Sequence, residues 1–161
     1  MSLKKQDITC RRSRGFTLIE VLVSMVILAI GLLGLAGLQT TGIRFNQSAL
    51  LRSQATLCAY DMADRMRANK ASAIAGDYAR SFGDTKPTQT CTSATSNCSG
   101  SQMAQADIKD WLESLQGLPS GDGAISVTSS GIATIIVHWN DTRDTSGNSS
   151  NLTSFTITTQ L

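Results

Sequence analysis

The first part of the chain has a long apolar stretch that gives way to an amphipathic pattern. Residues 21–38 contain no charged residue, and this is about the length of a helix that crosses the hydrocarbon core of a bilayer. Beyond it, apolar residues recur every three or four positions, at Leu51, Ala55, Cys58, Met62 and Met66. This spacing is one stripe of a helix. With no proline in between, the pattern predicts a single helix from Phe16 to about Asn69.

The middle of the chain is less regular. Residues 71–101 are rich in Ser, Thr, Ala and Gly and contain Pro87, which predicts a long connecting loop. A short helix is expected at about Gln102–Gln116, with Ser101 as its N-cap and Gly117 and Pro119 at its end. Its buried face is predicted to contain Ile108, Trp111, Leu112 and Leu115.

The last part of the chain alternates between apolar and polar residues and predicts an antiparallel sheet. The expected strands are Ala124–Ser129, Ile132–Asn140 and Leu152–Gln160, with a turn at Ser129-Ser130-Gly131 and a polar loop at Asp141–Asn151. One face of this sheet is apolar, and the striped helix 51–66 is the element available to cover it. The fold class is therefore α+β: a long N-terminal helix packed on a small antiparallel sheet of three to four strands, with a connecting loop and one short helix.

The charge distribution gives the apolar helix a direction. Five basic residues and one acidic residue precede it in residues 1–15, so the N-terminus is expected to stay cytoplasmic and the rest to lie across the membrane. The formal charge of +2 becomes −2 without those residues. The basic bias therefore reflects topology and does not indicate a nucleic-acid-binding surface.

Glu20 is the one ionisable residue near the start of the apolar run. Such a residue costs free energy in lipid and is a functional candidate by default. The alternative is a plain membrane anchor with Glu20 among the lipid headgroups. If a peptidase cut after Gly15, the new α-amino group on Phe16 would be the nearest counter-ion of Glu20, within one chain or between neighbouring helices.

The segment Arg14-Gly15-Phe16-Thr17-Leu18-Ile19-Glu20-Val21-Leu22-Val23 resembles the processing motif of type IV prepilins and type II secretion pseudopilins. The resemblance implies that a prepilin peptidase cuts after Gly15 and N-methylates Phe16. It also implies that Glu20 is the carboxylate that guides the subunit into a growing fibre. The expected fold is the pilin fold.

Two further stretches are similar to the PilV-type minor pilins. They are residues 30–39, Ile-Gly-Leu-Leu-Gly-Leu-Ala-Gly-Leu-Gln, and residues 59–69, Ala-Tyr-Asp-Met-Ala-Asp-Arg-Met-Arg-Ala-Asn. The resemblance implies a low-abundance structural subunit that helps to initiate the type IV pilus at its tip, in support of twitching motility and adhesion. The implied partners are other minor pilins, the major pilin, the prepilin peptidase and the inner-membrane assembly platform.

The cysteines fit a compartment beyond the membrane. Cys10 would leave with residues 1–15, and Cys91 and Cys98 flank a polar stretch that can bend back on itself. In an oxidising compartment a Cys91–Cys98 disulfide is the leading interpretation. Cys58 is expected to be a small core residue. Two thiols and the single distant His138 do not make a metal-ligand set.

Enzymatic interpretations have little support in the sequence. His138 lies on a predicted strand without a recognisable nucleophile near it, and a surface role is expected. Asp61, Asp64, Arg65 and Arg67 are expected to form a solvated helix face or salt bridges. No cofactor, metal or directly bound nucleic acid is predicted.

The predicted organisation has four parts: a leader peptide at 1–15, a transmembrane and assembly half-helix at 16–42, an amphipathic half-helix at 43–70 and a periplasmic head at 71–161. The expected location is the inner membrane, single-pass, with later incorporation into the pilus. Two other functions stay open. One is a pseudopilin of a type II secretion system, and the other is a membrane-anchored periplasmic enzyme or sensor.

Overall fold

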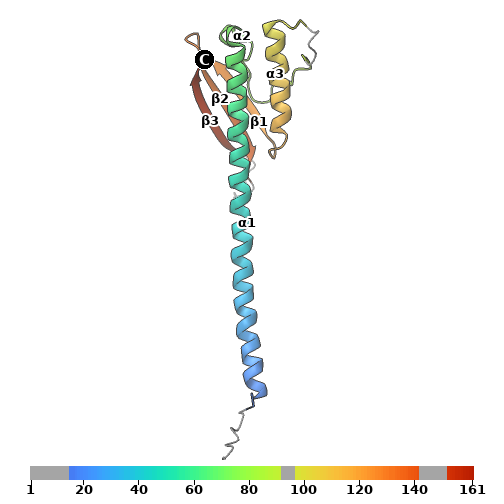
Figure 1. The fold of residues 1–161 in the computed structure, drawn as a ribbon, viewed down its shortest axis with the longest axis vertical. Coiled ribbons are helices and arrows are strands. Elements are labelled where there is room, and N and C mark those ends of the chain that lie inside the picture. The colour runs from blue at the N-terminus through green and yellow to red at the C-terminus, as the bar shows by residue number, and fades with distance from the viewer. Residues whose placement is uncertain (1–14, 92–96, 142–151) are drawn as a thin grey trace, which may run out of the picture. The chain divides into compact units, whose positions relative to one another are not determined.

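The computed structural model describes residues 15–91, 97–141 and 152–161 and has an α+β fold (Figure 1). Along the chain follow α1 (Leu18–Ala68), α2 (Lys70–Ala75), α3 (Gly100–Leu115), β1 (Asp122–Val127), β2 (Ile132–Asn140) and β3 (Leu152–Gln160). The predicted leader, up to residue 14, and the predicted polar loop, at 142–151, lie outside the described residues. The chain forms two compact units, Met1–Ile43 and Arg44–Leu161.

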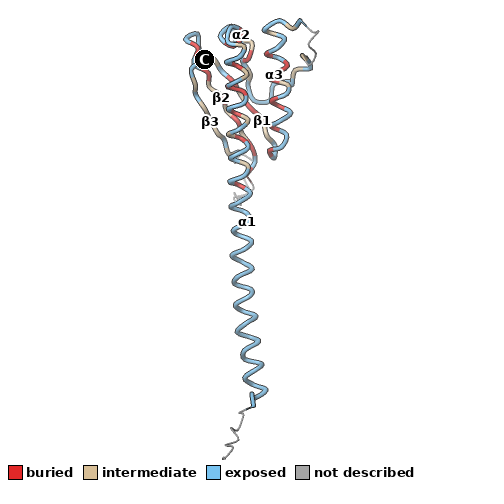
Figure 2. The backbone as a smooth tube through the Cα atoms, in the orientation of Figure 1, coloured by how far each residue is buried: buried red, intermediate tan, exposed pale blue. Residues whose placement is uncertain are grey.

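The described part of the first unit is an apolar helix that buries none of its side chains. The carbonyl oxygen of Thr17 accepts from the Glu20 and Val21 amides, at 3.1 and 3.4 Å, and so opens α1. The most apolar window of α1 has a mean hydropathy of 2.7 and is 0 % buried, as the pale blue tube in Figure 2 shows. In the described residues this helix alone is long and apolar enough to span a membrane.

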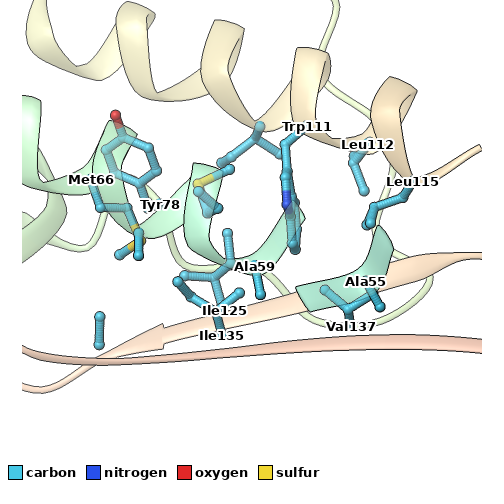
Figure 3. Packing of buried hydrophobic residues seen from close by; sticks show 14 of the residues in the cluster. Ala55, Ala59, Met66, Tyr78, Trp111, Leu112, Leu115, Ile125, Ile135 and Val137 are labelled. Carbon is cyan, nitrogen blue, oxygen red and sulfur yellow. The ribbon is translucent and has the colours of Figure 1, made fainter. Parts of the chain in front are cut away.

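In the second unit, the continuation of α1 provides one wall of the core. Ala55, Ala59, Met62 and Met66 are fully buried, while Leu51 and Cys58 are half-buried and pack against the same cluster. The predicted stripe is thus confirmed. Alanines at two positions let the helix backbone lie close to the residues that it covers (Figure 3).

The sheet provides the opposite wall. Its strands follow the order β1-β2-β3, all antiparallel, and the register places Ile135 opposite both Ile125 and Ile157. Ile135, Val137 and Trp139 alternate with half-exposed residues along β2 and point into the core. The β1–β2 turn closes through a Gly131 amide that donates to Thr128 O at 2.9 Å, with Gly131 at φ 78°. The predicted hairpin is confirmed.

Helix α3 completes the core with the predicted buried face. Trp111 is fully buried and its indole Nε1 donates to the carbonyl oxygen of Cys58 on α1, at 2.8 Å. It also lies so close to β1 that a Cβ on Gly123 would come within 2.1 Å of its ring. The predicted N-cap, Ser101, is wrong. Ser99 caps the helix, because its hydroxyl accepts from the Gln102 amide while the Gln102 side chain accepts from the Ser99 amide.

Other boundaries also differ from the prediction, by one or two residues at the ends of α1 and α3 and by more in the segment between them. Residues 71–101 do not form a loop throughout, because α2 occupies their beginning and the structure has two short helices where one was expected. Helix α2 ends at Gly76, which adopts φ 93° and donates to the carbonyls of Ser72 and Ala73. The first strand begins and ends two residues earlier than expected, at Asp122 and Val127, because its backbone pairing with β2 runs from Asp122 opposite His138 to Val127 opposite Ala133. The side chain of Asp122 accepts hydrogen bonds from Arg80 and Gly83.

Candidate assembly site

The segment around the predicted cleavage site is open and irregular. Gly15, Phe16 and Thr17 precede the first residue of α1 and have no regular secondary structure. Phe16 is 84 % exposed, and no atom lies within 4 Å of where a Cβ on Gly15 would be. Exposed, non-helical backbone is the form in which peptidases usually cut a chain. The geometry therefore leaves the Gly15–Phe16 bond accessible.

Glu20 lies in the first turn of α1 on the same side as Phe16. Together with Ser24 and three apolar neighbours, these residues line a shallow hollow of about 390 Å³. The Ser24 hydroxyl donates to the Glu20 carbonyl oxygen at 2.7 Å and leaves the carboxylate untouched. Within the described residues the carboxylate has no protein partner. The positive end of the helix dipole favours a negative charge in this turn, and a cationic group placed near Phe16 would complete the pair.

The charged residues in the upper part of α1 are engaged in structural contacts. Arg65 bonds to Asp61 at 2.8 Å and to Asp107 of α3 at 3.2 Å, and Arg67 bonds to Asp64 at 2.7 Å. The predicted salt bridges are confirmed. The hydroxyl of buried Tyr78 donates to Asp107 at 2.6 Å. Burial, helped by this bond, raises the pKa of Tyr78 well above its ordinary value.

The remaining candidates for chemistry lie apart from one another. Cys91 and Cys98 are joined by a disulfide, the pairing that the sequence predicted, and Cys58 is a free thiol whose Sγ lies 3.6 Å from the Ser114 hydroxyl. His138 is half-buried, and its ring stacks on Phe82 with centroids 4.2 Å apart. Among the residues that the structure describes, no group of three or more His, Cys, Asp or Glu side chains could hold a metal ion.

Comparison with known families places two adjacent matches on the chain. Residues 10–36 match the prokaryotic N-terminal methylation motif, which contains Gly15, Phe16 and Glu20. Residues 37–109 match the model described as type IV pilin Tt1218. Comparisons with curated proteins and with solved structures gave no match. The chain is therefore similar to type IV pilins over residues 10–109, first to the methylation motif and directly after it to a pilin model, and its α+β fold with a long N-terminal apolar helix is pilin-like.

Proposed function

We propose that this chain is a minor pilin, a structural subunit that helps to start assembly of a type IV pilus. The observation that carries the proposal is an accessible Gly15–Phe16 bond, inside a methylation motif, one helical turn before Glu20, whose carboxylate has no partner among the described residues. The pilin domain over residues 37–109 supports the same conclusion, because its family consists of structural subunits.

The role proposed for Glu20 follows from the free energy of a charge in lipid. An unpaired carboxylate is unfavourable at membrane depth. Cleavage after Gly15 would create an α-amino group on Phe16, which can pair with Glu20 of its own chain or of the next subunit. Pairing across the helix–helix contact would favour entry of the subunit in one register. N-methylation of Phe16 would keep the positive charge that this pairing requires.

The proposed topology has four parts. Residues 1–15 are a cytoplasmic leader that is removed, 16–42 span the inner membrane and later enter the fibre, 43–70 continue the helix, and 71–161 form a periplasmic head. The Cys91–Cys98 disulfide supports an oxidising location for the head.

The assignment as a minor pilin is supported by the similarity of residues 30–39 and 59–69 to the sequences of PilV-type minor pilins. In this proposal the subunit sits near the pilus tip, beside other minor pilins and above the major pilin. Before it enters the fibre, the prepilin peptidase processes it and the inner-membrane assembly platform binds it. Twitching motility and adhesion would then depend on it through pilus initiation, without any chemistry on a substrate.

The first test identifies the N-terminal residue of the mature chain and then removes the charge of Glu20. Mass spectrometry of the chain from fibres should find an N-methylated Phe16 as the first residue. The Glu20→Gln variant should be cut normally, but its amount in fibres should fall at least tenfold, because the amine of Phe16 then lacks its partner. The control Glu113→Gln removes an exposed carboxylate of the head and should be incorporated normally. An intact Met1 start would overturn the proposal.

A pseudopilin of a type II secretion system is the second candidate, because it would use the same motif. Deleting the gene separates the two. Loss of surface pili and twitching supports the pilin, whereas loss of exoprotein secretion with normal pili supports the pseudopilin. A membrane-anchored enzyme or sensor would keep residues 1–15 and tolerate Glu20→Gln.

A further inference from the structure

The two edges of the sheet differ in their backbone pairing. The strand order β1-β2-β3 makes β1 and β3 the edge strands. The outer edge of β1 is occupied, because the Arg80 amide donates to Ile125 O at 3.0 Å and the Ile125 amide donates to Arg80 O at 2.9 Å. Among the described residues, β3 pairs only with β2, along all nine of its residues. Its other edge is therefore unpaired in this part of the chain.

The backbone groups on the outer edge of β3 follow from the register. The Leu161 amide donates to Gly131 O at 2.9 Å, so the hydrogen-bonded pairs with β2 are those of Leu161 and of every second residue before it. The N–H and C=O groups of the residues in between point away from β2. These residues are Leu152, Ser154, Thr156, Thr158 and Gln160. They present a row of donors and acceptors that have no backbone partner among the described residues.

Strand β3 lacks the features by which proteins usually protect an edge strand. It contains no charged residue and no proline. Its register with β2 is continuous over the whole strand, so no bulge twists the edge away. Charges, prolines, bulges and short strands are the normal protection against pairing with another chain. A nine-residue edge without any of them indicates that a further strand pairs there.

The apolar core reaches this edge and is incompletely covered there. Phe155 and Ile157 lie on the core side of β3, pack against the core cluster and are only half-buried. On the same side, Arg67 of α1 donates to Thr159 Oγ1 at 2.5 Å. Tyr60 lies two turns before Arg67, on the same side of the helix, and is 50 % exposed. Side chains of an added strand would complete the cover of these groups.

We propose that β3 receives an extended segment of another protein, which adds to the sheet as a fourth, antiparallel strand. The antiparallel direction continues the pattern of this sheet and pairs more strongly than the parallel one. The residues of the segment opposite Phe155 and Ile157 would be apolar. Those opposite Thr156 and its neighbours would be polar and uncharged, to match their hydroxyl groups. The inference goes beyond the proposed function, since fibre entry through Glu20 does not require it.

A second copy of this chain in the same membrane does not fit as the occupant, a step that rests on the proposed topology. Antiparallel pairing of two β3 edges needs a twofold axis perpendicular to the sheet. This axis would reverse α1, which packs against the sheet face, whereas copies in one membrane all point the same way. The β1 edge of a copy runs parallel to β3, but Arg80 occupies it. The occupant is therefore a terminus or long loop that is free to lie antiparallel.

The sequence of β3 itself provides a probe. The strand is nearly symmetric about Thr156, because antiparallel self-pairing places Phe155 opposite Ile157 and Ser154 opposite Thr158. A free peptide of residues 152–161 carries no α1 to restrict its direction. With a fluorescent label, this peptide should bind the detergent-solubilised full chain saturably, as measured by fluorescence anisotropy.

Two N-methylated forms of the peptide test the backbone pairing. Methyl groups on the amides of Ser154 and Thr158 block donors that would face β3, and should weaken binding at least about tenfold. Methyl groups on the amides of Phe155 and Ile157 block donors that face away from β3, and should leave the affinity unchanged. The two peptides have the same composition and the same number of methyl groups, so non-specific binding to detergent affects both equally.

Thr156→Pro tests the same edge on the protein. The Thr156 amide points away from β2, so proline removes an outer donor and no bond to β2. Peptide binding should fall at least about tenfold, whereas Thr156→Val keeps the amide and should bind normally. Both variants should unfold at the temperature of the unchanged chain. If the proline variant does not fold, Ser154→Lys with Thr158→Lys replaces it, because two charges protect the edge.

Three results would count against these proposals, and they can be told apart. Equal affinity of the two methylated peptides, or normal binding of the peptide to a folded edge variant, would overturn the inference. Disulfide-linked dimers of Thr156→Cys in cell membranes, joined at position 156, would overturn the choice of occupant in favour of a second copy. An intact Met1 start would overturn the proposed function while the peptide result stands.

Discussion

Tyr78 shows how single polar groups hold the second unit together. Its side chain is fully buried, and its hydroxyl both donates to Asp107 at 2.6 Å and accepts from Nδ2 of the Asn69 side chain at 3.3 Å. Asp107 is also bonded to Arg65. One hydroxyl thus links the end of α1, the segment after α2, and α3. Charged partners make such hydrogen bonds stronger than neutral ones.

Tyr78→Phe should therefore destabilise the chain. The change removes the donor to a largely buried carboxylate, and the expected loss is about 1–3 kcal/mol in the free energy of unfolding. Tyr60→Phe is the matched control, since Tyr60 is half-exposed and should lose little. Chemical denaturation of the detergent-solubilised chain measures both. Equal midpoints for the two variants would contradict this account of the Tyr78 network.

At the level of elements, Asp122 fastens the start of β1 to the segment after α2. Its carboxylate accepts from Arg80 Nη2 at 2.8 Å and from the Gly83 amide at 2.8 Å, and the Arg80 side chain is almost fully buried. Burial by itself raises the pKa of Asp122. The hydrogen bonds from Gly83, Arg80 and Gly123 outweigh it, so the net effect is a lowered pKa.

This lowered pKa predicts a loss of stability in acid. A carboxyl group that is more acidic in the folded state stabilises the fold at every pH above its unfolded value of about 3.9. That contribution is lost as the pH falls through the folded pKa. Unfolding of the unchanged chain, measured from pH 6 to pH 2.5, should show the loss below about pH 4. Asp122→Asn should be less stable at pH 6 and show a shallower acid slope, whereas Asp64→Asn, at an exposed position, should keep the slope.

The elements that the sequence predicted best are those whose residues repeat with a clear period. The bounds of β2 and β3 match the prediction, and the buried face of α3 does as well. Helix α2 was missed because it has only six residues, too few for a helical period to emerge. The N-cap of α3 was misplaced because two serines, Ser99 and Ser101, stand on either side of a glycine, and either could cap a helix. Only the hydrogen bonds of Ser99 identify it as the cap.

The candidate assembly site, too, could be predicted only where its residues are contiguous in the sequence. Gly15, Phe16 and Glu20 stand in a contiguous motif, so the sequence predicts them directly. The groove lined by Leu57, Ser114 and Leu118 joins residues about sixty positions apart, so it exists only because α3 packs on α1.

For the whole molecule, the division into two units predicts that the second can exist alone. The fully buried apolar residues begin at Ala55 and lie in the unit Arg44–Leu161. A chain of residues 44–161 should be soluble without detergent and should unfold in one cooperative step, because it keeps the whole core and loses the apolar helix.

A shorter chain of residues 63–161 is the control. It lacks Ala55, Ala59 and Met62 and the carbonyl of Cys58 that binds Trp111, so it should fail to fold. Circular dichroism and thermal unfolding distinguish the two chains. A molten or aggregated 44–161 chain would contradict the independence of the second unit.

The disulfide stands directly before the cap of α3, with Cys98 followed by Ser99. The covalent link and the two reciprocal hydrogen bonds of the cap thus fix consecutive residues at the start of α3. Reduction of the disulfide should therefore release the residue before the cap while the two hydrogen bonds between Ser99 and Gln102 still hold the first turn of α3.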